Sequence, residues 1–155
     1  MNEQEREHIK RVDAIVSELT RRGELRKLWN GVGSERPLLS AFRPPLWVCN
    51  LFGEASQFHD VGYWVGGTEW HREAVDQEFE RRCFEAMQDL GFWQRLRAKF
   101  WVGLCGDLVR NFGALAFTLR PMGPEYNLDA LLVEAGSGKI IKVNREATMP
   151  VRVKG

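Results

Sequence analysis

The sequence has few cysteines, and their spacing follows no recognisable pattern. The 155 residues include three cysteines, Cys49, Cys83 and Cys105. An odd number of cysteines cannot all pair in disulfides within one chain. Residues 1–7 are mostly charged and lack the apolar core of a signal peptide. We therefore expect reduced thiols and a cytoplasmic location.

Long apolar runs and an excess of one charge are also missing. The longest apolar run, Phe100 to Cys105, is far shorter than the roughly 20 residues of a membrane helix, so we predict no transmembrane segment. The formal net charge is +1, and Lys and Arg are spread along the chain, so we expect no nucleic-acid partner. A hydrophobic fraction of 44% is typical of a globular protein, and we predict a single domain over residues 1–155.

Apolar residues recur at helical spacing over much of the chain, which predicts four helices. The first is an amphipathic helix within residues 1–22. The second runs from near Asn50, as its cap, to Val65, and the third from Glu69 to Leu90 after a Thr68 cap. The fourth spans 92–112, and its middle is apolar on nearly all sides, so we predict that it is the most buried helix.

The character of the sequence changes after Pro121. Residues 130–135 and 139–143 flank Gly136-Ser137-Gly138, a pattern that predicts a β-hairpin within residues 128–153. The predicted fold is therefore mainly α, with an antiparallel pair of active-site-type helices and a small C-terminal β-hairpin.

Residues capable of acid–base chemistry lie on the second and third predicted helices. His59 shares a helix face with Tyr63, and Asp60 projects about 100° away. Asp76 lies at the border of the apolar stripe of the third predicted helix. The short connection Gly66-Gly67-Thr68 folds this helix back on the helix that carries His59. We expect Asp76 to reach His59 or Tyr63, which is the geometry of a base oriented by a second acid.

These residues resemble the active-site helix pair of the phospholipase A2 superfamily. The likeness rests on His59-Asp60-Val61-Gly62-Tyr63, on the following Gly66-Gly67 and on Asp76-Gln77-Glu78-Phe79. It covers residues 49–113 and is closest to uncharacterised prokaryotic or prophage-borne relatives.

The resemblance implies hydrolysis of a phospholipid or small ester substrate, assisted by calcium. His59 would be the general base, Asp60 the calcium ligand, and Asp76 with Tyr63 the groups that fix the imidazole. The family also supplies calcium with carbonyls of a glycine-rich loop before the histidine, but Leu39 to Phe42 contains no glycine, so this loop is not recognisable. Asp60 without that loop predicts weak calcium binding, because the number of oxygen ligands sets the affinity.

Two alternatives remain at this point. In one, a buried His59 bonded to Asp76 or Tyr63 pins two helices, and the chain is a non-catalytic phage or prophage-type structural or interaction module. In the other, His59, Asp60 and His71, with Cys49, bind a transition metal, although their spacing matches no standard zinc pattern. His71 would otherwise face solvent in the first turn of its helix.

Several tryptophans also allow two interpretations. They form a lipid-facing collar in one and contribute to the core in the other, and the second is the commoner role of aromatic side chains in small helical domains. The residues concerned are Trp64, Trp70, Trp93 and Trp101.

Overall fold

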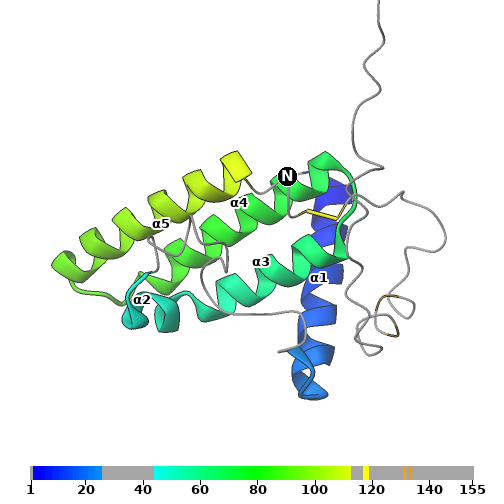
Figure 1. Cartoon of the computed structure of the whole chain (residues 1–155), viewed down its shortest axis with the longest axis horizontal. Coiled ribbons are helices and arrows are strands. Elements are labelled where there is room, and N and C mark those ends of the chain that lie inside the picture. Colours follow the sequence, from blue (N-terminus) through cyan, green and yellow to red (C-terminus); the bar gives the residue numbers. More distant parts are fainter. Residues whose placement is uncertain (1, 26–43, 113–116, 119–130, 132, 134–155) are drawn as a thin grey trace, which may run out of the picture.

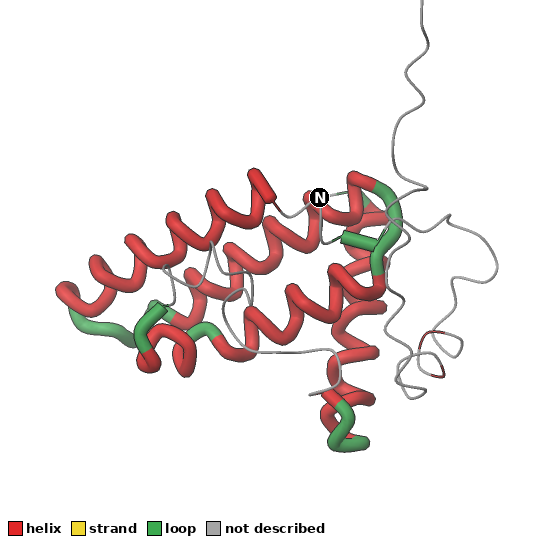
Figure 2. The backbone as a smooth tube through the Cα atoms, viewed as in Figure 1, coloured by secondary structure: helices red, strands yellow, loops and turns green. Residues whose placement is uncertain are grey.

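The computed structural model describes residues 2–25, 44–112, 117–118, 131 and 133, with the backbone alone for 108–112. This part of the chain is mainly helical, as predicted (Figures 1 and 2). The helices are α1 (Glu3–Arg21), α2 (Leu46–Leu51), α3 (Gly53–Val65), α4 (Glu69–Ala86) and α5 (Phe92–Phe112).

Helices α3, α4 and α5 lie side by side, and each runs antiparallel to the one before it (Figure 1). Helix α1 crosses one end of the α3–α4 pair at a steep angle and contacts both helices. The predicted antiparallel packing of the helices before and after Gly66-Gly67 is therefore confirmed.

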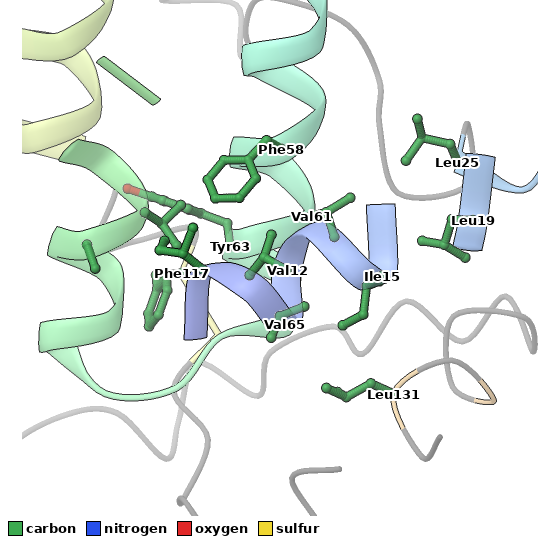
Figure 3. Packing of buried hydrophobic residues seen from close by; sticks show 13 residues of the cluster. Val12, Ile15, Leu19, Leu25, Phe58, Val61, Tyr63, Val65, Phe117 and Leu131 are labelled. Atoms are coloured by element: carbon green, nitrogen blue, oxygen red, sulfur yellow. The ribbon is translucent and has the colours of Figure 1, made fainter. Parts of the chain in front are cut away.

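Helix α1 agrees with its sequence pattern at both its start and its core face. Asn2 forms a capping box with Glu5, because each backbone N–H donates to the other's side chain, at 2.7 and 2.9 Å. Its apolar stripe packs against Phe58, Val61 and Val65 of α3 (Figure 3). The buried members of that stripe are Ile9, Val12, Ile15 and Leu19.

A second apolar cluster lies at the other end of the α3–α4 pair. It joins α2 and α5 to that pair, and burial of these side chains stabilises the packing of the helices. Its buried members are Val48, Phe52, Ala55, Phe79, Cys83, Met87, Ala98 and Val102.

The turn between α3 and α4 depends on glycine. Gly66 and Gly67 have φ angles of +69° and +135°, which other residues rarely adopt. A Cβ at Gly66 would lie 1.9 Å from the carbonyl oxygen of Thr118, and the N–H of Gly67 donates to that same oxygen at 2.9 Å. The N–H of Thr118 donates in turn to the carbonyl of Tyr63 at 3.1 Å, so this downstream residue fastens the turn.

Three predicted helix features are wrong. The helix predicted from Asn50 to Val65 is two helices, because α2 begins directly after Pro45 and the chain bends at Phe52 before α3. Helix α4 ends at Ala86, and residues up to Leu90 form tighter turns with bonds to the third preceding carbonyl. Helix α5 has the predicted bounds but is not the most buried helix, since one line including Ala98 and Val102 faces the bundle.

The predicted β-hairpin lies outside the described residues, apart from Leu131 and Val133. The backbone of these two residues is helical, and Leu131 is buried in the cluster with α1.

Helices α3 and α4 approach closely where Gly62 faces Val75. A Cβ added at Gly62 would lie 2.7 Å from Cγ1 and 2.9 Å from Cγ2 of Val75. We therefore expect Gly62→Ala to lower the free energy of unfolding by about 1–3 kcal/mol, as overpacking typically does. Gly103→Ala in exposed α5 is the matched control, because a Cβ there meets nothing within 4 Å and should stabilise by roughly 0.5–1 kcal/mol. Urea denaturation in which both variants shift alike would contradict this account of the crossing.

His8 of α1 and His71 of α4 meet inside the α1–α4 contact. Both are buried, and their ring centroids are 4.4 Å apart. Burial, with the charges of His71 and Arg11, lowers the pKa of His8 to about 3. The folded protein therefore keeps His8 neutral at pH values where the unfolded chain, with a pKa of about 6.5, takes up a proton.

This difference predicts acid sensitivity, because stability falls as the pH drops below about 6.5. A single such group contributes at most about 1.4 kcal/mol per pH unit. We expect His8→Phe to flatten the loss of unfolding free energy between pH ~6 and ~4, measured by urea denaturation. Parallel pH curves for the wild type and the variant would show that the loss arises elsewhere.

Candidate active site

The carboxylate of Asp76 on α4 binds side chains from both helices of the pair. Its Oδ1 accepts hydrogen bonds from Tyr63 Oη at 2.8 Å and from His59 Nε2 at 3.1 Å, and its Oδ2 accepts one from Arg72 Nη1 at 2.9 Å. His59 and Tyr63 lie one turn apart on α3, and Arg72 and Asp76 lie one turn apart on α4. The predicted contact of Asp76 with His59 and Tyr63 is confirmed, whereas their catalytic roles remain predictions.

Because the side chains of this network are buried, their charged groups must remain paired with one another. The side chains of His59, Arg72 and Asp76 are each 11% exposed. An anion this deep is stable only with opposite charge and hydrogen bonds, which Arg72 and the two α3 donors supply. Arg72 also bonds Glu69, and these contacts raise its pKa, so it remains a cation.

Aromatic rings hold the His59 imidazole in one orientation. The ring centroid of Tyr63 lies 4.1 Å from that of His59, and the centroid of Phe79 lies 5.0 Å away. Tyr63 is itself packed edge-on against Phe117, at 5.3 Å. Burial and the charge of Asp76 raise the pKa of Tyr63, which keeps its hydroxyl group protonated as a donor.

The second ring nitrogen of His59 faces Asp60. The distance from Nδ1 to Asp60 Oδ1 is 3.7 Å, longer than a hydrogen bond, and the Asp60 side chain is 29% exposed. The site therefore has a closed side at Asp76 and a side at Asp60 that reaches solvent.

The two sides of the site set the protonation of its groups. Burial acts to lower the pKa of His59, but the carboxylates of Asp60 and Asp76 outweigh it and raise that pKa above its ordinary value. Burial also raises the pKa of Asp60, against the favourable effect of His59. A neutral His59 that donates from Nε2 to Asp76 presents the lone pair of Nδ1 toward Asp60.

Sequence reasoning missed one residue of this site, Arg72, and one contact, between Phe79 and His59. Arg72 lies four positions before Asp76, so helical spacing was the signal that could have identified it as the counter-charge. Phe79 was noted as part of the motif, but its ring contact with His59 depends on how the two helices cross.

The alternative transition-metal site does not form in the described part of the chain. His71 is buried, and not exposed as expected, because Thr68 N–H donates to its Nδ1 at 3.1 Å in a capping box and His8 covers its ring. No group of three or more His, Cys, Asp or Glu side chains among the described residues is placed to hold a metal ion.

A hollow of about 660 Å³ lies beside α2, the start of α3 and the end of α4. Its lining includes Asn50, Glu54, Arg81 and Arg82. Arg81 pairs with Glu78 and Glu85, and Arg82 pairs with Glu78 and with Asp13 of α1, so both cations of the hollow already have acidic partners. None of the four predicted site residues lines it.

No family model, curated protein or solved structure matches this chain. Among the described helices, none combines the length and hydropathy needed to cross a bilayer. The chemistry of the site is therefore inferred from its own side chains.

The two aspartates should differ sharply in their effect on stability. Asp76→Ala removes the acceptor of three buried donors, so we expect the free energy of unfolding to fall by about 1–3 kcal/mol. Asp60→Ala changes a partly exposed side chain and should shift it by less than about 0.5 kcal/mol. Urea denaturation in calcium-free buffer measures both, and Asp76→Asn, which keeps the shape but not the charge, should fall between them. Equal losses for the two alanine variants would refute this assignment.

Proposed function

We propose that this chain is a phospholipase A2-like hydrolase of a phospholipid or related small ester, with His59 as the general base. One observation carries the proposal: Asp76 fixes Nε2 of His59 on the closed side, so that Nδ1 is directed to the side that reaches solvent. The resemblance of the His59–Tyr63 motif to that superfamily independently suggests the same chemistry.

The neutral form of His59 is the form that acts as a base. With Nε2 donating to Asp76, Nδ1 accepts a proton, and a water molecule that bonds both Nδ1 and Asp60 satisfies two acceptors that otherwise face each other. Removal of that proton turns the water into the nucleophile that attacks the ester carbonyl. Arg72 already balances Asp76, so His59 need not be charged to stabilise the buried carboxylate.

Asp60 is the residue that we propose as a calcium ligand. It supplies the hard, anionic oxygen that calcium prefers, and a cation beside it would offset the burial that raises its pKa. Further oxygens are needed, since calcium takes six to eight, and Leu39 to Phe42, where the superfamily places its carbonyl loop, lies outside the described residues. A bound calcium ion would polarise the ester carbonyl and stabilise the developing oxyanion.

A non-catalytic phage or prophage-type structural or interaction module on the same scaffold is the second candidate. The observation that favours it is the enclosure of His59 between two aromatic rings and Asp76, which is equally suited to pinning α3 to α4. In that case the network contributes stability and performs no reaction.

The activity of His59→Gln separates these two functions. We expect this variant to abolish cleavage of phospholipid or ester substrate while remaining folded, because the amide side chain cannot take a proton from water.

Chelation of calcium should reduce wild-type turnover in the same way, and Asp60→Asn should weaken calcium binding measured by calorimetry. The wild-type rate should rise with pH above about 6.5, since the raised pKa of His59 shifts the neutral form to higher pH.

The control is Gln77→Ala, an exposed position next to Asp76, which should retain full activity. A wild-type protein that gives no ester cleavage, no heat and no thermal shift in millimolar calcium would leave the non-catalytic module as the function.

A further inference from the structure

Helix α5 presents a stripe of large apolar side chains to solvent. The α5 stripe consists of Phe92, Trp93, Leu96 and Phe100, which are 73%, 73%, 53% and 66% exposed. Three of its members are spaced by four residues, and Trp93 adjoins them, so they form one continuous face. An exposed apolar face of this kind is uncommon on a monomer and marks a surface that binds something.

Basic side chains border the α5 stripe. Helical geometry places Lys99 along one edge and Arg97 along the other, and both are exposed. Residues 92–106 contain no Asp or Glu, and the nearest acidic side chains along the chain are Asp89 and Asp107. Arg95 has a different role, because its Nη2 donates to the carbonyls of Gln88 and Leu90 at the α4–α5 corner.

The Arg97 edge of the α5 stripe adjoins α2. The guanidinium of Arg97 lies 5.9 Å from the ring centroid of Trp47, which places this second exposed tryptophan beside α5. Leu46, next to it, is also largely exposed. Helix α2 therefore adds exposed apolar side chains beside the Arg97 edge of the α5 stripe.

We propose that the α5 stripe docks the protein on a lipid surface that carries anionic headgroups. A helix with Trp, Phe and Leu on one face and Lys or Arg along its edges lies in the plane of the interface, with its apolar face among the acyl chains. The long stems of Arg97 and Lys99 allow their charges to reach phosphates while the stripe inserts. Charge complementarity selects anionic over zwitterionic headgroups, since each cation near such a surface adds affinity.

Two other occupants fit the charge pattern less well. A symmetric pair formed by α5 of two copies would bring Arg97 and Lys99 of both chains to one interface, where like charges repel. Single-stranded nucleic acid stacks on aromatic rings in basic grooves, but the α5 stripe is a convex helix face with its cations along the edges.

The docking proposal does not rest on hydrolysis, because no side chain described for α5 belongs to the His59 network. His59→Gln therefore tests the two separately. It should bind vesicles as the wild type does, whether or not the wild type cleaves lipid.

Vesicle flotation of the full chain, at low salt, tests the surface. We expect binding to vesicles of phosphatidylcholine with added phosphatidylglycerol, weaker binding to phosphatidylcholine alone, and loss of the difference at high salt. Trp93→Ser and Phe100→Ser should each weaken binding about tenfold or more, and Arg97→Glu or Lys99→Glu about fivefold or more. Trp70→Ser on α4 is the matched control, since Trp70 is a similarly exposed tryptophan outside the stripe, and it should leave binding unchanged.

Several outcomes would overturn the proposal. Absence of binding to both kinds of vesicle is one, and an equal loss for Trp70→Ser and Trp93→Ser is another. Sedimentation velocity that shows a dimer dissociated by Trp93→Ser, without vesicle binding, would identify the stripe as an interface between copies. Binding to a single-stranded oligonucleotide in place of vesicles would assign it to nucleic acid.

Discussion

One buried carboxylate determines how the two central helices pair. Asp76 lies on α4, but two of its three hydrogen-bond donors come from α3, so neither helix satisfies its own polar groups without the other. The Gly62–Val75 contact brings the helix axes close enough for these bonds, and the glycine turn fixes their direction. Because an unpaired anion in this position is costly, the network also specifies the register of α3 against α4.

His59 and His8 respond to pH in opposite directions because their surroundings differ. His59 is surrounded by carboxylates, so a proton on its ring is favoured in the fold, and the stability this provides is lost as pH rises through its raised pKa. His8 is buried, and it lies beside another imidazole and near Arg11, so its neutral form is favoured. For His8 burial is the main cause of the lowered pKa, whereas for His59 the neighbouring carboxylates together outweigh burial and reverse the direction.

The local sequence pattern was sufficient to predict the contacts within the candidate site, but not to predict which side chains lie at the surface. The His59–Asp76–Tyr63 contact could be predicted because helical spacing and a short glycine turn leave few ways to fold one helix on the other. The exposure of α5 could not be predicted, because the periodicity of apolar residues does not show how many helices pack against a given helix. His71 was misjudged for a related reason, since its burial depends on a ring contributed by α1.

The bond between Thr118 and the α3–α4 turn links the site to a distant part of the sequence. Thr118 contacts the backbone of Tyr63 and Gly67, and Phe117 supports the Tyr63 ring. During translation α3 and α4 are synthesised before either downstream residue has been added. A nascent chain can therefore form the α3–α4 hairpin early, but Phe117 and Thr118 can pack against it only after α5 has also emerged. The order of synthesis thus places the contacts of Phe117 and Thr118 with Tyr63 and Gly67 among the last to form.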